Sequence, residues 1–143
     1  VGTVVVLLLR AGRRADASFL LAVTAGVQIL VALLKSHYGR PRPDAGSPIA
    51  LPHSFSFPSG HAATGIAVGG ALAVVWAESA PSTAVRVGML ALGVLAGVAI
   101  GASRVVLNVH YFSDVLAGYC VGLAWLCVCL LVRELHAGRG HRA

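Results

Sequence analysis

The stretch SFPSGHAATG, residues 56–65, places a proline, a serine, a glycine and a histidine just before an apolar run that ends at Ala77. The run from Ala62 to Ala77 is close to membrane-spanning length and lacks the strict alternation of a half-buried strand. The stretch therefore predicts the polar entrance of a membrane helix. His61 stands at this entrance and needs polar partners from elsewhere in the chain.

The composition of the chain is typical of a membrane protein. Of its 143 residues, 57% are hydrophobic and 11% are charged, whereas a soluble domain usually carries about 25% charged residues. The net charge of +6 comes from basic residues in loops and at segment ends, which favours membrane orientation and anionic groups over nucleic acid as the partner. We predict one polytopic domain over residues 1–143 with the bilayer around it.

Three more apolar segments approach spanning length, at residues 17–34, 84–102 and 115–132. A further apolar segment at the N-terminus, from Val1 to Leu9, is too short to cross. As a helix it would extend only about 14 Å, whereas the hydrocarbon core is about 30 Å thick. Because the chain begins with Val rather than Met, we expect a truncated first helix there. The predicted fold class is all-α: a transmembrane bundle of four full spans plus a partial N-terminal span.

Glycines recur at four-residue steps in the last three predicted spans. Such faces let helix backbones approach closely in lipid. We interpret these glycines as packing residues, namely Gly65, Gly69, Gly93, Gly97, Gly101, Gly118 and Gly122.

If all four segments cross, the charged residues divide between two sides of the membrane. The positive-inside rule assigns the side with the following seven arginines to the cytoplasm: Arg10, Arg13, Arg14, Arg86, Arg133, Arg139 and Arg142. Three polar clusters reach the other side, KSHYGRPRP at 35–43, PSGH at 58–61 and SRVVLNVHYFSD at 103–114. Polar clusters at a membrane edge are typical of functional sites, so we predict one that faces the periplasm or exterior.

The clusters contain cations with few acids near them. Together, Lys35, Arg42 and Arg104 could hold a tetrahedral dianion such as phosphate. Each alone is more typical of a side chain that reaches lipid headgroups. For Arg40 the sequence favours a headgroup contact over a fourth phosphate contact.

His110 and Asp114 stand four residues apart, so on a helix they share a face. The carboxylate could hold one imidazole nitrogen and leave the other free to attack. A structural ion pair is the alternative interpretation.

Ser59 and Gly60 precede the apolar helix, where free backbone N–H groups and the helix dipole favour an anion. An ordinary serine N-cap is the alternative. His61 beside an oxyanion would keep its proton and could act as a general acid.

Three motifs follow one another along the chain: K-x6-R-P from Lys35 to Pro43, PSGH at 58–61, and S-R-x5-H-x3-D from Ser103 to Asp114. Together they resemble the signature of the type 2 phosphatidic acid phosphatase (PAP2) family, over a motif core of residues 35–114. That superfamily includes vanadium-dependent haloperoxidases, bacterial class A acid phosphatases and glucose-6-phosphatase. Its membrane members typically have six transmembrane helices, whereas this chain has four full spans and part of another.

The resemblance implies a PAP2-like membrane phosphatase that needs no cofactor and no metal. His110 would be the nucleophile that forms a phospho-histidine, Asp114 would orient it, and His61 would protonate the leaving oxygen and later activate water. The phosphoryl oxygens would be held by Lys35, Arg42, Ser59, Gly60 and Arg104. The outer side also carries only two acids, Asp44 and Asp114, which are too few for a dedicated magnesium site.

The implied substrate is a lipid phosphate or diphosphate: phosphatidic acid, phosphatidylglycerophosphate or a polyprenyl diphosphate such as the undecaprenyl carrier. The Ala-, Val-, Gly- and Arg-rich composition is typical of a GC-rich bacterium, and an outward-facing site in its inner membrane would suit recycling of the polyprenyl diphosphate carrier. Two alternatives stay open. A haloperoxidase would share the phosphate pocket, but those enzymes are soluble. A non-catalytic protein that binds or transports lipid headgroups would have no need of His110 or Asp114.

Overall fold

The computed structural model describes residues 1–43 and 54–140, and this part of the chain forms five α-helices and no strand. The helices are α1 (Gly2–Arg10), α2 (Arg14–Tyr38), α3 (Gly60–Ala77), α4 (Thr83–Val106) and α5 (Phe112–Gly140). Helices α2 to α5 are each long and apolar enough to cross a membrane, whereas α1 has 9 residues. The prediction of an all-α bundle with four full spans and a short first helix is confirmed.

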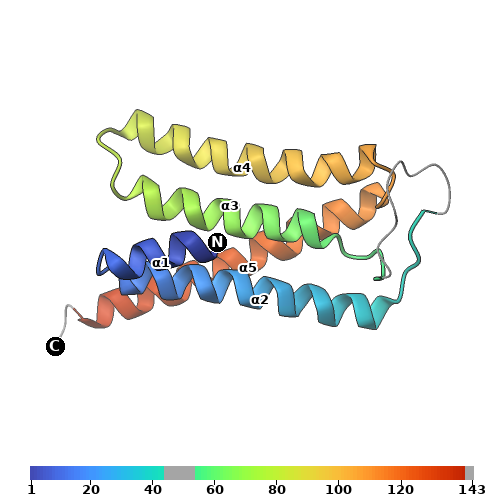
Figure 1. The fold of residues 1–143 in the computed structure, drawn as a ribbon, viewed down its shortest axis with the longest axis horizontal. Coiled ribbons are helices and arrows are strands. Elements are labelled where there is room, and N and C mark those ends of the chain that lie inside the picture. The colour runs from blue at the N-terminus through green and yellow to red at the C-terminus, as the bar shows by residue number, and fades with distance from the viewer. Residues whose placement is uncertain (44–53, 141–143) are drawn as a thin grey trace.

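Successive helices from α2 to α5 run in opposite directions (Figure 1). The C-terminal ends of α2 and α4 and the N-terminal ends of α3 and α5 therefore meet at one end of the bundle. All three polar clusters belong to this end, as the sequence predicted, and we call it the cluster end. Asp44, one of the two acids predicted on the outer side, belongs to residues 44–53, outside the described part of the chain.

Local sequence sets the helix ends at the cluster end. Gly39 ends α2 in a left-handed conformation with φ of 56°, and its N–H donates to the Lys35 carbonyl at 3.0 Å. Helix α3 begins after Ser59, whose Oγ accepts the Ala62 N–H at 3.4 Å. Next to these two ends, Arg40 and Ser56 both contact Asp114 at the start of α5.

Helix α3 is central and contacts α2, α4 and α5. It meets α4 along glycines: a Cβ added at Gly69 would lie 3.0 Å from the Gly93 carbonyl oxygen, and one at Gly65 would lie 3.2 Å from the Gly97 carbonyl oxygen. The close approach of these backbones confirms that the glycines are packing residues.

Glycines also bring α5 against the first turns of α3. A Cβ added at Gly118 would lie 2.5 Å from the Ser59 carbonyl oxygen, and one at Gly122 would overlap the Ala63 carbonyl. Because the contacts are with backbone atoms, a side chain could be accommodated only by moving one helix. This contact therefore holds the entrance of α3 next to the first turns of α5.

An ion-pair network ties the helices together at the opposite end. The buried Asp16 carboxylate lies 2.6 Å from Arg13 Nε and 2.6 Å from Arg133 Nη2. Arg133 also pairs with Glu78, at 2.7 Å. The network links the start of α2, the end of α3 and the last turns of α5, so both ends of the bundle are fixed by polar contacts.

Adding a methyl group at the α3–α5 contact should destabilise the protein. We expect Gly122→Ala to lower the midpoint of thermal unfolding in detergent, because overpacking a tight contact costs roughly 1–3 kcal/mol. Gly88→Ala is the matched control: Gly88 is also within a helix, and a Cβ there would meet nothing within 4 Å. Equal midpoints for the two variants would show that the contact is not tight.

Candidate functional site

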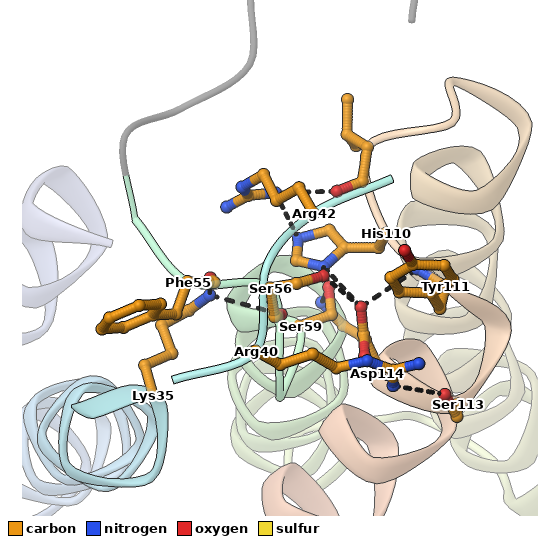
Figure 2. A network of polar contacts seen from close by, with 12 residues as sticks. Lys35, Arg40, Arg42, Phe55, Ser56, Ser59, His110, Tyr111, Ser113 and Asp114 are labelled. Atoms are coloured by element: carbon orange, nitrogen blue, oxygen red, sulfur yellow. Dashed lines mark hydrogen bonds and ion pairs between the residues drawn. The ribbon is translucent and has the colours of Figure 1, made fainter. Parts of the chain in front are cut away.

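His110 and Asp114 form a buried pair at the start of α5. The His110 Nδ1 atom lies 3.4 Å from Asp114 Oδ2, and the side chains are 3% and 0% exposed. His110 lies just before α5 rather than on it, so the pair spans the helix entrance (Figure 2). The structure brings the two side chains into contact even though His110 precedes α5, which begins at Phe112.

The contact between the second ring nitrogen of His110 and Arg42 indicates which tautomer the neutral imidazole adopts. His110 Nε2 lies 3.1 Å from Arg42 Nη1, and a guanidinium can only donate. Nε2 is therefore the acceptor, and in the neutral imidazole the hydrogen lies on Nδ1, toward Asp114. The nitrogen that faces Arg42 carries a lone pair, which is the form that a nucleophile requires.

Two further side chains hold the Asp114 carboxylate in addition to that of His110. Arg40 Nη1 donates to Oδ1 at 2.8 Å, and the hydroxyl of the fully buried Ser56 donates to Oδ2 (Figure 2). The sequence favours a headgroup contact for Arg40 and gives no signal for Ser56. The spacing of residues along the sequence could not reveal these contacts. Arg40 stands 74 residues before Asp114, and Ser56 stands 58 residues before it.

Arg42 connects three parts of the site. Its Nε donates to the Ser54 carbonyl at 2.9 Å, and its Nη1 donates to the Val109 carbonyl at 2.8 Å as well as facing His110. Burial lowers the pKa of Arg42 from its ordinary value, an effect that the Asp114 charge partly opposes. Arg42 thus fixes a positive charge beside His110 Nε2.

Lys35 supplies a second positive charge, from the last turn of α2. Its Nζ donates to the carbonyl of Phe55 and lies 3.4 Å from that of Ser56 (Figure 2). The ammonium group therefore fastens the segment before α3 to the end of α2.

A pocket of about 670 Å³ lies between α2, α3 and α4 and reaches these residues. Its polar end is lined by Lys35, Arg42, Gly60, His61 and His110. From there it continues along apolar and small residues that include Val31, Val68, Leu72, Ala96 and Ile100. The structure thus brings five of the eight predicted site residues to one end of a pocket whose other end is apolar.

The remaining three predicted site residues take other positions. Within the described residues, the pocket wall includes none of Asp114, Ser59 and Arg104. Asp114 lies behind His110, Ser59 is fully buried with its Oγ capping α3, and Arg104 Nε donates to Ser103 Oγ at 3.1 Å in the last turn of α4. The phosphate-binding roles of Ser59 and Arg104 stay predictions.

The polar end of the pocket is suited to an anion. It combines two cationic side chains with two histidines and the backbone at the N-terminus of α3. Residues 1–43 and 54–140 contain no group of three or more His, Cys, Asp or Glu side chains that could hold a metal ion. Lys35 and Arg42 are the cationic side chains that line this end of the pocket.

Comparisons with known proteins agree on a family. The PAP2 superfamily model matches residues 16–136. Phosphatidylglycerophosphatase B of Bacillus subtilis (strain 168) is 36% identical over 110 residues, which are 76% of this chain and 53% of that protein. The crystal structure of a transmembrane PAP2-type phosphatidylglycerolphosphate phosphatase from Bacillus subtilis matches with a TM-score of 0.78 at 30% identity.

The structural match covers 83% of this chain and 59% of the Bacillus subtilis chain. The chain therefore spans little more than half the length of the relatives it matches. Its four apolar helices and its similarity to a transmembrane protein identify an integral membrane protein.

The surroundings of His110 make its protonation state testable. Burial and the positive charge of Arg42 lower its pKa from 6.5 to about 4, and the hydrogen bond to Asp114 opposes this shift. We expect the imidazole to stay neutral as the pH falls through 6.5 and to gain a proton only near pH 4. NMR titration of histidine-labelled protein in micelles, with His110→Asn to assign the signal, measures this pKa. A titration near 6.5 would contradict the predicted environment.

Proposed function

The chain belongs to the PAP2 superfamily, and from that premise we propose that it is a membrane phosphatase that releases phosphate from a lipid phosphate through a phospho-histidine intermediate. The observation that carries the proposal is the pocket, in which two histidines and two cations adjoin an apolar groove between α2, α3 and α4. A lipid phosphate has the same division into an anionic head and an apolar tail. Phosphatidylglycerophosphate is the first substrate to test, because the Bacillus subtilis relatives are named for it.

In the first proposed step, the lone pair on His110 Nε2 attacks the phosphorus atom. A P–N bond forms while the bond to the lipid oxygen breaks, and His61 gives that oxygen its proton. Lys35 and Arg42 bind the phosphoryl oxygens, where negative charge is spread in the transition state. Arg42 faces Nε2 at 3.1 Å in the free protein, so we expect its guanidinium to move onto the entering phosphate.

In the second step, water attacks the phosphorus atom and His61 takes a proton from it. The P–N bond breaks, its electron pair returns to Nε2, and inorganic phosphate leaves. The Nδ1–H stays directed at Asp114 throughout, because the carboxylate stabilises the imidazole while Nε2 carries the phosphoryl group.

The distribution of arginines supports a site that faces the periplasm or exterior. The described arginines at the end opposite the pocket are Arg10, Arg13, Arg14, Arg86 and Arg133. Under the positive-inside rule this end is cytoplasmic, which puts the pocket at the outer boundary of a bacterial inner membrane. A lipid could present its headgroup there while its tail stays in the bilayer.

Phosphate release from lipid phosphates tests the proposed function. We expect the purified protein to release phosphate from phosphatidylglycerophosphate in mixed micelles with EDTA present, because Lys35 and Arg42 supply the positive charge. His110→Ala should reduce release to the level without enzyme, and His61→Ala should lower kcat about 10²–10⁴-fold by removing the general acid. Phosphatidic acid and a polyprenyl diphosphate, assayed in parallel, define the substrate class.

Three outcomes would count against parts of this proposal. Full activity in His110→Ala would exclude the phospho-histidine mechanism. Loss of release with EDTA would exclude metal independence. Binding of lipid phosphates without release from any of them would favour the non-catalytic headgroup-binding function.

Filling the apolar groove should affect lipid substrates selectively. We expect Ala96→Phe, in the α4 wall of the pocket, to raise KM for phosphatidylglycerophosphate and to leave hydrolysis of the tail-free p-nitrophenyl phosphate unchanged. Ala91→Phe is the matched control, because Ala91 is an exposed residue of the same helix outside the pocket lining. Equal effects of Ala96→Phe on both substrates would show that the groove does not hold the tail.

A further inference from the structure

Both oxygens of the Asp114 carboxylate are occupied, although the side chain has no exposed surface. Arg40 Nη1 donates to Oδ1 at 2.8 Å. Oδ2 accepts from the Ser56 hydroxyl and from the Tyr111 N–H at 3.0 Å, and it lies 3.4 Å from His110 Nδ1 (Figure 2). The carboxylate that orients His110 is thus itself held from two sides.

Arg40 is fixed in the position from which it contacts Asp114. Its Nη1 also donates to Ser113 Oγ at 2.8 Å, and its guanidinium lies 4.2 Å from the centroid of the Tyr111 ring. Its carbonyl accepts the Ser56 N–H at 2.8 Å. Arg40 therefore positions Asp114 through its side chain and Ser56 through its backbone.

The charge of Arg40 bears on the nucleophile. A buried carboxylate without a balancing cation would draw a proton onto the adjacent imidazole. His110 protonated on both nitrogens would have no lone pair for attack on phosphorus. By pairing with Oδ1, the guanidinium balances the carboxylate charge while Oδ2 still faces Nδ1.

The other charged or titratable groups around His110 differ in their effect. The charges of Lys35 and Arg42 oppose its protonation, and Asp114 favours it. His61 lines the same pocket. Burial is the largest effect that keeps His110 neutral, Asp114 is the group that opposes it, and Arg40 is the ion-pair partner of Asp114.

Ser56 fixes the direction of the imidazole. Its hydroxyl donates to Asp114 Oδ2 and lies 3.4 Å from His110 Nδ1, and the residue is fully buried. The Nδ1–H thus points toward Ser56 Oγ and Asp114 Oδ2. That orientation directs Nε2 to the pocket.

We propose that Arg40 and Ser56 are positioning residues for phosphoryl transfer, which act through Asp114 to keep His110 neutral and directed at the phosphorus atom. The kinetic part of this inference rests on the proposed function. The electrostatic part concerns the free protein and can be measured without substrate.

The experiment combines NMR titration of His110 with the pH dependence of kcat/KM. We expect Arg40→Gln to raise the His110 pKa from about 4 toward 6.5. The ratio of kcat/KM at low pH to that at neutral pH should then fall about tenfold relative to wild type, because the protonated imidazole cannot attack. Ionisation of the substrate phosphate is common to both proteins and cancels in this comparison.

Three further variants separate charge, hydrogen bonding and general effects. Arg40→Lys keeps the charge and should retain a low His110 pKa. Ser56→Ala removes a donor to Oδ2 and should raise that pKa, by less than Arg40→Gln does. Arg10→Gln, an exposed arginine at the opposite end of the bundle, should match wild type in both measurements.

An unchanged His110 pKa in Arg40→Gln would overturn the inference even if activity fell, because a merely structural role would reduce activity without moving that pKa. If Arg40→Gln does not fold, Ser56→Ala decides: a wild-type pKa and pH ratio there would overturn the inference. A shifted pKa in a protein that releases no phosphate from any lipid would instead contradict the proposed function and leave the electrostatic role of Arg40 in place.

Discussion

The cluster end of the bundle depends on the hydrogen bonds that the buried Asp114 accepts. Its side chain accepts hydrogen bonds from Arg40 and Ser56, and its backbone carbonyl accepts the Ser59 N–H at 2.9 Å. A buried carboxylate must be satisfied by protein donors, since water does not reach it. The segment after α2 and the segment before α3 are therefore both held against the start of α5, with His110 enclosed between them.

Glycine contacts make this arrangement possible. Gly118 and Gly122 let α5 lie directly against the first turns of α3, so the Ser59 N–H can reach Asp114. On the other side of α3, Gly65 and Gly69 admit α4. A transmembrane bundle without a hydrophobic driving force between its helices relies on such close backbone contacts. The same packing that stabilises the helices places the histidines at one end of the pocket.

The pocket has a polar end and an apolar end because it extends from the helix ends into the membrane-spanning part of the bundle. Lys35 and His61 at helix ends, and His110 just before α5, lie at the cluster end, whereas the helix interiors beneath them contribute apolar and small side chains. One continuous space is therefore cationic at its outer end and apolar along α3. In the proposed reaction this polarity orients the substrate, and the enzyme needs to stabilise charge only at the outer end.

The sequence by itself determined the helical class, the spans, the packing glycines and the end at which the polar clusters meet, because each follows from periodicity, length and alternating direction. It also predicted the His110–Asp114 pair, which local spacing brings together. It did not reveal that Arg40 and Ser56 hold Asp114, nor that Ser59 and Arg104 lie outside the pocket wall. Those features were decided by the tertiary structure, because partners more than 50 residues apart meet only when the helices pack and buried polar atoms require donors.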